Sequence, residues 1–322
     1  MTDPAQESRQ EESILIIRNG SIGDFVQALG ALSAIRMHHG DAEITLATGP
    51  NVAPFAKAAP YFDNVKTDPG TIFGLRSIIH SQSFDLIYDL DTTKRTDRTF
   101  LVSKSWRQLV GRDAPVPWCG TAKGCSHPYL KAETMQMHAS DRLMTQLQAA
   151  GISEHPPISL AWVSHAVGTF ALPISLSEPF VLLAVDPGGE KQAQWASSRY
   201  ADMAEIAFAR GERPVLVGEQ EAPEVSEAVR DVVAETVDLC GKASHVEVVF
   251  LAWAANSAVG PDNGIMHLIT TAGCKSVVLY DPGSDAALHG HRGPDVTILR
   301  RHDLAAITAA EVVQTLKNPS SP

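Results

Sequence analysis

The sequence lacks any long uninterrupted run of apolar residues, although 44% of its 322 residues are hydrophobic. No run approaches the roughly 18 residues that a membrane-spanning helix requires. Residues 1–13 are polar and contain no apolar segment of the kind that a secretory signal carries. We therefore expect a cytoplasmic protein without a membrane span.

Cysteine and positive charge are both scarce. The four cysteines, Cys119, Cys125, Cys240 and Cys274, form no CxxC pair, which favours reduced thiols over disulfides. Cys119, Cys125 and His127 could be imagined as metal ligands, but their spacing matches no common zinc site, so we expect no metal. The net charge of −11 argues against nucleic acid as a partner.

Strand-like and helical segments alternate along both halves of the chain. The first half is predicted to hold strands at 14–17, 42–47 and 84–90, helices at 23–38 and 133–150, and a helical turn at 52–59. The second half is predicted to hold strands at 180–185, 213–217, 237–239, 258–259 and 276–280, and helices at 197–210, 222–234, 246–255, 266–272 and 305–316. This alternation predicts parallel sheets with helices on both faces.

A proline-rich break at 155–178 separates the two series. We expect an α/β protein with two doubly wound, Rossmann-like domains facing a cleft, one at 1–165 and one at 178–322. The last helix could pack back on the first domain.

One loop of interest follows the first strand and reads RNGSIGDF over 18–25. Its two glycines, Gly20 and Gly23, permit a sharp turn and a close approach of a ligand, but the GxGxxG dinucleotide fingerprint is absent. Asp24 falls in the first turn of the predicted helix. It either compensates the helix dipole or supplies a carboxylate where open α/β folds bind their ligands.

A second loop, DNGIMHL over 262–268, also joins a buried strand to a helix. Exposed backbone N–H groups and the helix dipole at such a junction favour a phosphate. Asp262 and His267 could grip the rest of a nucleotide or sugar. In the simpler structural interpretation, the Asp caps the helix and the His packs in the core.

Residues 94–131 form a basic segment inside this acidic protein. They contain eight Lys or Arg side chains and two Asp, a local net charge of +6. The segment is either a solvated basic face or a surface that meets an anionic acceptor.

Four blocks in order resemble glycosyltransferase family nine, the heptosyltransferases of lipopolysaccharide core assembly. They read ILIIRNGSIGD (14–24), DPGGEKQAQW (186–195), LCGKAS (239–244) and VGPDNGIMHLITTAGCKSVVLYDPGSD (259–285). The resemblance implies a GT-B fold and inverting transfer of a sugar, typically heptose, from an ADP-linked donor to a lipopolysaccharide-core-type acceptor, an anionic glycolipid. It implies no metal and no cofactor, since the ADP-sugar is a substrate.

The resemblance implies that the domain at 1–165 is on the acceptor side and that the domain at 178–322 binds the nucleotide sugar. It also assigns roles to individual residues. Asp24 matches the family's general base. The residues expected at the donor are Gly188, Gly189, Lys191, Asp262, Asn263, Gly264, Met266 and His267. The residues expected at the acceptor are Ser21, Lys94, Arg95 and Arg98.

Three positions depart from the family pattern. Ala193 stands where a phosphate-binding Lys is usual, and we expect Lys191 to compensate. Asn263 replaces a usual Thr or Ser, and Asp91, in the sequence Asp89-Leu90-Asp91, replaces a usual Gln. Ala193 also favours an alternative, in which the protein is a catalytically silent family member that binds sugar nucleotide or glycolipid as a scaffold or sensor. Trp195 could stack on a base, but a core aromatic is the stronger expectation.

Overall fold

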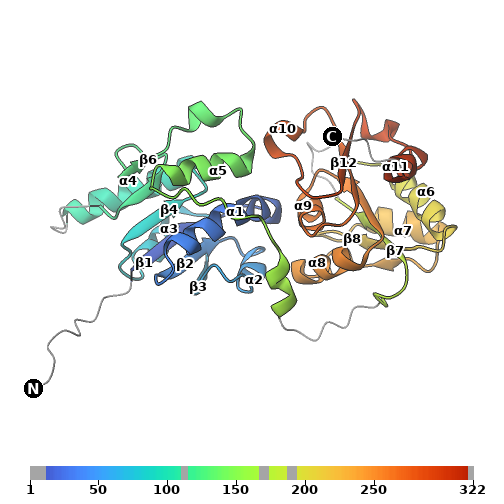
Figure 1. The fold of residues 1–322 in the computed structure, drawn as a ribbon, viewed down its shortest axis with the longest axis horizontal. Helices are drawn as coiled ribbons and strands as arrows, with labels where there is room; N and C mark the ends of the chain where they lie inside the picture. Colours follow the sequence, from blue (N-terminus) through green and yellow to red (C-terminus); the bar gives the residue numbers. More distant parts are fainter. Residues whose placement is uncertain (1–11, 110–114, 167–173, 187–193, 318–322) are drawn as a thin grey trace, which may run out of the picture. The chain divides into compact units, whose positions relative to one another are not determined.

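The computed structural model describes residues 12–109, 115–166, 174–186 and 194–317. Its contacts divide the chain into two compact units (Figure 1). The N-terminal unit comprises residues 1–21, 28–135 and 140–157; the C-terminal unit comprises 22–27, 136–139 and 158–322. The division at 157/158 falls inside the proline-rich break that the sequence indicates.

The N-terminal unit is built on one parallel six-stranded sheet. Its strands are β1 (Ser13–Ile17), β2 (Glu43–Thr48), β3 (Asn64–Thr67), β4 (Leu86–Asp89), β5 (Trp118–Gly120) and β6 (His127–Pro128). They are arranged in the order β3-β2-β1-β4-β5-β6. Strand β1 lies in the middle, and Ile14 to Ile17 are completely buried, as a parallel strand covered on both faces requires.

Helices cover this sheet on both faces (Figure 1). They are α1 (Ile22–His38), α2 (Ala53–Ala56), α3 (Ile72–Ile79), α4 (Lys94–Leu109) and α5 (Ala139–Gln148), with a 3-10 turn at Lys131–Thr134. The helix predicted at 133–150 is shorter than expected. It begins at Ala139, where the apolar side chains that reach the core, Leu143 and Leu147, start to recur at helical spacing, whereas Met137 before it is 36% exposed.

The C-terminal unit repeats the same strand order. Its strands are β7 (Phe180–Ala184), β8 (Arg213–Val217), β9 (Val237–Asp238), β10 (Ser257–Pro261), β11 (Ser276–Tyr280) and β12 (Val296–Arg300). The sheet runs β12-β11-β10-β7-β8-β9, all parallel, so each unit has the Rossmann arrangement of six strands. The two doubly wound α/β sheets that the sequence predicts are confirmed.

The C-terminal helices form two groups. They are α6 (Ser197–Phe208), α7 (Pro223–Val232), α8 (His245–Ala254), α9 (Gly264–Thr271), α10 (Ala286–His289) and α11 (Ala309–Lys317), with 3-10 turns at Ala161–His165 and Leu304–Ala306. Helix α6 packs on α7 and α11, and α8 packs on α9. The last helix packs within its own unit, where Val312, Val313 and Leu316 join the core.

Each sheet reverses its strand order at one point, between β1 and β4 in one unit and between β7 and β10 in the other. Loops that leave neighbouring strands in opposite directions open a crevice there, at the carboxyl ends of the strands. The loops 18–21 and 90–93 flank this point in the N-terminal unit, and Asp262 and Asn263 follow β10 in the C-terminal unit.

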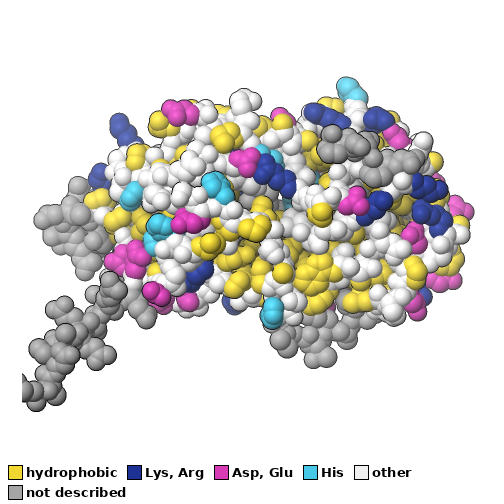
Figure 2. All heavy atoms as spheres, in the orientation of Figure 1, with side chains coloured by type: hydrophobic (Ala, Val, Ile, Leu, Met, Phe, Trp, Pro, Cys, Tyr) yellow, Lys and Arg dark blue, Asp and Glu magenta, His cyan; other side chains and the backbone are white. Residues whose placement is uncertain are grey.

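Within the described residues, no helix combines the length and the apolar character needed to cross a bilayer. On the face drawn in Figure 2, basic and acidic side chains are interspersed.

Asp89, the last residue of β4, is a fully buried carboxyl group. Its Oδ1 accepts hydrogen bonds from the backbone N–H groups of Asp91 (3.2 Å) and Thr92 (3.0 Å). Burial is the largest influence on this group and raises its pKa to about 7, with the charge of Asp91 acting in the same direction.

This raised pKa predicts a pH-dependent stability. The folded protein keeps a proton on Asp89 that the unfolded chain, with a pKa near 3.8, releases between about pH 4 and 7. The free energy of unfolding should therefore fall as pH rises through that window, by at most a few kcal/mol. We expect Asp89→Asn to flatten this dependence in urea unfolding followed by circular dichroism, and Asp41→Asn, at an exposed carboxylate, to leave it unchanged. An unaltered slope in Asp89→Asn would contradict the assignment.

Candidate functional site

The first turn of α1 carries Asp24, half-exposed, and Ser21 precedes the helix and is exposed. The contacts group this turn with the C-terminal unit. A Cβ atom added at Gly23 would lie 2.8 Å from His267 Cδ2 and 3.2 Å from Gly264 Cα, so glycine is required for this approach. Within this unit, the structure thus brings the first turn of α1 against the start of α9.

The start of α9 is organised by Asn263. Its side-chain oxygen accepts a hydrogen bond from the Met266 N–H at 2.9 Å, which makes it the N-cap of the helix. The Met266 N–H expected to face a diphosphate is therefore satisfied by the protein. A Cβ atom at Gly264 would collide with Ile22 Cγ2 at 2.7 Å, so this glycine is also required by packing.

Behind this loop, two histidines form a stacked pair. The rings of His267 and His291 lie 3.8 Å apart with an interplanar angle of 12°. His291 Nδ1 is 2.7 Å from the Tyr280 hydroxyl and 3.6 Å from Asp262 Oδ1. Tyr280 and His291 were not identified from the sequence, because the contacts of His291 with His267 and with Tyr280 join three separate segments.

Both histidines are neutral near pH 7. Burial lowers the pKa of His267 to about 4, although the charge of Asp24 opposes the shift. Burial also lowers the pKa of His291 well below its ordinary value, and burial raises the pKa of Asp262. The pair can exchange hydrogen bonds but supplies no positive charge to a phosphate.

Asp262, His267 and His291 are the one group of three His, Cys, Asp or Glu side chains in the described part of the chain whose ligand atoms lie within 4.8 Å of one another. The stacking does not suit joint coordination of a metal. Imidazole lone pairs lie in the ring plane, and an ion shared by two parallel rings would sit well outside both planes. Cys119 and Cys125 do not join this group; their thiols contact backbone carbonyls.

The expected donor residues Gly188, Gly189 and Lys191 fall in 187–193, outside the described residues, as does Ala193. Trp195 lies two residues after this segment, and its side chain is 2% exposed. Its Nε1 donates to the Ile307 carbonyl at 2.9 Å, and its ring packs edge-on against Tyr200. Trp195 is thus the core aromatic that the sequence favoured.

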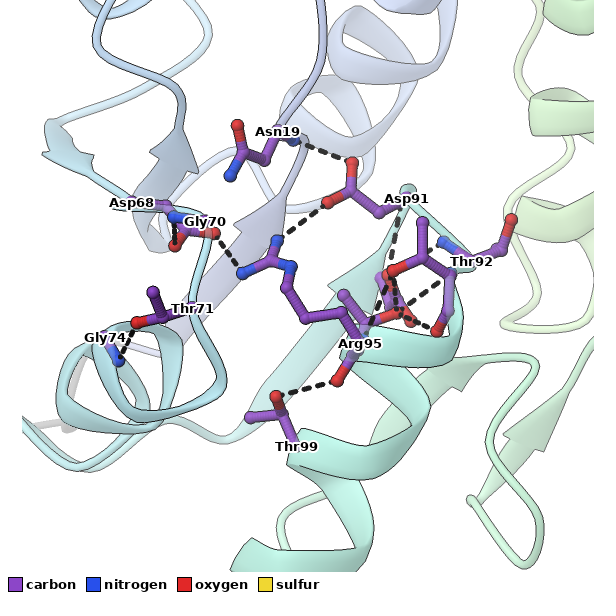
Figure 3. Close-up of polar contacts among 12 residues, drawn as sticks. Asn19, Asp68, Gly70, Thr71, Gly74, Asp91, Thr92, Arg95 and Thr99 are labelled. Carbon is purple, nitrogen blue, oxygen red and sulfur yellow. Dashed lines mark hydrogen bonds and ion pairs between the residues drawn. The ribbon is translucent and has the colours of Figure 1, made fainter.

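The three side chains of α4 that were expected at the acceptor differ in exposure and in ion pairing. Lys94 and Arg98 are exposed, as expected for residues that meet an acceptor. Arg95 is not the free cation that the sequence suggested. Its Nη1 lies 2.8 Å from Asp68 Oδ2 and its Nη2 lies 3.2 Å from Asp91 Oδ2 (Figure 3). Asp68 was missed because it lies 27 residues before Arg95 and only the sheet brings the two together.

Comparison with known proteins agrees with this architecture. The model of glycosyltransferase family 9 (heptosyltransferase) matches residues 124–310, more than half of the chain. The chain belongs to this family and is therefore a glycosyltransferase. A search of curated proteins finds no match.

Three solved structures share the fold over nearly the whole chain. A family 9 glycosyl transferase from Veillonella parvula has a TM-score of 0.73 at 16% identity, covering 96% of this chain and 98% of its own. ADP-heptose lps heptosyltransferase II of E. coli has a TM-score of 0.72 at 19% identity, covering 95% and 97%. E. coli heptosyltransferase WaaC, solved with ADP, has a TM-score of 0.72 at 18% identity, covering 96% and 100%.

The cap on α9 can be tested by substitution. Asn263→Ala removes the acceptor of the Met266 N–H and should lower the free energy of unfolding by about 1 kcal/mol. Asn263→Ser keeps an oxygen at the cap and should retain most of that stability. Urea unfolding of both variants distinguishes the cap from a side chain of no structural importance, for which the two variants would behave alike.

Proposed function

We propose that this glycosyltransferase moves a sugar, heptose in the first instance, from an ADP-linked donor to an anionic acceptor of the lipopolysaccharide-core type, with inversion. The observation that carries the proposal is the approach of the Asp24 turn to the start of α9, where Asp262 and His267 lie. The names of the relatives support the donor: WaaC has been solved with ADP and with ADP-2-deoxy-2-fluoro heptose.

In this proposal Asp24 is the general base of a single displacement. The acceptor hydroxyl attacks the anomeric carbon, the bond to the diphosphate breaks, and the carboxylate takes the hydroxyl proton. The oxocarbenium-like transition state delays proton loss, so an ionised carboxylate suffices. The positive end of the α1 dipole favours a negative charge at this position.

The leaving diphosphate needs stabilisation that the neutral histidine pair does not supply. We assign this role to backbone N–H groups at the carboxyl end of the C-terminal sheet and to Lys191, in place of the Lys that Ala193 replaces. The proposal includes neither a metal ion nor a cofactor. It places the reaction at the cytoplasmic face of the inner membrane, with peripheral contact.

Ala193 favours the alternative of a catalytically silent protein that binds sugar nucleotide or glycolipid. Incubation with ADP-heptose, with and without acceptor, separates the two functions. The transferase releases ADP in proportion to acceptor, whereas a binding protein protects the donor without turnover.

Asp24→Asn tests the base directly. The amide keeps the shape of the side chain but cannot accept the proton, so kcat should fall by roughly 10²–10⁴ while the affinity for ADP changes little. Turnover is measured by ADP release and affinity by calorimetry. Asp41→Asn, which removes an exposed carboxylate in the N-terminal unit, is the control and should retain wild-type kcat. Undiminished transfer by Asp24→Asn would exclude this residue as the base.

Lys94→Gln together with Arg98→Gln tests the acceptor surface. Removing two exposed charges should raise the acceptor KM several-fold and leave the donor KM unchanged, and the difference should fade as salt screens the surface. Arg210→Gln, at an exposed position after α6, is the matched charge control. A rise in donor KM would place the acceptor elsewhere.

A further inference from the structure

Three loops at the carboxyl edge of the N-terminal sheet are tied together by one arginine and two aspartates. The loops are 18–21 after β1, 68–71 after β3 and 90–93 after β4. Arg95, at the start of α4, reaches across to Asp68 and Asp91, as Figure 3 shows.

The loop after β4 is in turn hydrogen-bonded to the loop that leads into α1. Asp91 Oδ1 accepts a hydrogen bond from the Asn19 backbone N–H at 2.7 Å. Arg18 Nη1 donates to the Leu90 carbonyl at 3.0 Å. Two bonds therefore fix residues 18 and 19, five to six positions before Asp24 in the chain.

The charged groups of this cluster are largely withdrawn from water. The side chain of Asp68 is 0% exposed, that of Asp91 is 4% exposed and that of Arg95 is 19% exposed. Solvent screening is weak at such burial, and removing one partner leaves another charge buried without compensation. The ion pairs consequently hold a defined geometry, unlike exposed pairs on the surface.

The turns that carry the two aspartates are themselves held by aspartate hydrogen bonds, from Asp68 in one loop and from Asp89 in the other. Asp68 Oδ1 accepts from the Gly70 N–H at 2.9 Å, in a turn where Gly70 has a φ of 78°. Thr92, next to Asp91, has a φ of 47°, and its N–H is bound by Asp89. The backbone of both loops is thereby held by contacts that do not involve Arg95.

We propose that Arg95 and Asp91 are positioning residues, which hold the β1–α1 loop and so set the place of Asp24 at the start of α1. The inference rests on the proposed function and reassigns Arg95 from the acceptor to this role. A shift of about 1 Å in a catalytic group can lower a rate about 10²-fold. Loss of the network should therefore reduce kcat and spare acceptor binding.

The test uses Arg95→Lys and Asp91→Asn. Lysine keeps the charge but cannot span two carboxylates, and asparagine keeps an acceptor oxygen for Asn19 but loses the ion pair. In both we expect kcat for ADP release to fall about 10- to 100-fold with an acceptor KM within about twofold of wild type. Hydrogen–deuterium exchange of peptides covering residues 18–24 should be faster in both variants.

Arg36→Lys is the matched control. Arg36 lies near the other end of α1, is similarly buried (20% exposed) and pairs with Asp63. This variant should leave kcat and exchange at 18–24 unchanged. If Arg95→Lys fails to fold, the near-isosteric Asp91→Asn carries the test alone.

The two readouts separate this inference from the proposed function. Exchange at 18–24 reports on the loop whether or not ADP-heptose is turned over, so an inactive wild-type protein would refute the function alone. Unchanged exchange in Asp91→Asn would overturn the positioning role. A raised acceptor KM with unchanged kcat in Arg95→Lys would likewise overturn it, by making Arg95 an acceptor ligand.

Discussion

The burial of the central strands on both faces is the constraint on which the rest of this structure depends. Ile14 to Ile17 of β1 and Ala258 to Pro261 of β10 are buried and carry no polar side chain. Polar groups can collect only where the strands end. In each unit the reversal of strand order opens the sheet at such ends, and Asp24, Asp91 and Asp262 all follow central strands there.

Desolvation then decides the charges of these groups. The histidine pair behind α9 is neutral because burial disfavours the imidazolium form. Asp68 and Asp91 instead share the guanidinium of Arg95, which compensates carboxylates that water cannot reach. One edge of the fold thus holds an ionic network, while the start of α9 holds neutral rings.

Two glycines allow the first turn of α1 and the start of α9 to approach each other closely. A side chain at Gly23 would displace His267, and one at Gly264 would displace Ile22. Gly260 serves the same purpose inside the C-terminal sheet, where a Cβ atom would lie 2.7 Å from the Ala184 carbonyl oxygen. Because glycine has no Cβ atom, the backbone at these three positions packs closely against its neighbours and leaves no gap in the core.

The sequence by itself determined the parts whose signal is local. Apolar runs and helical spacing located β1, α1, β10 and α9, and four ordered blocks indicated the family that the family model confirms. The edge strands β3 and β12 were not predicted, because they are only partly buried and carry no continuous apolar run. The helix at 94–109 was read as a basic segment alone, because its polar composition hides the helical period.

Only the tertiary structure decided which distant side chains meet. The stacking of His291 on His267 joins residues 24 positions apart in the chain. The pairing of Arg95 with Asp68 joins the start of α4 to the loop after β3. A linear pattern records residue type and spacing, whereas the ion pairing of Arg95 and the neutrality of His267 depend on packing contacts from other segments. For that reason the sequence indicated the loops that form the candidate site, and the fold decided which groups there are paired, buried or exposed.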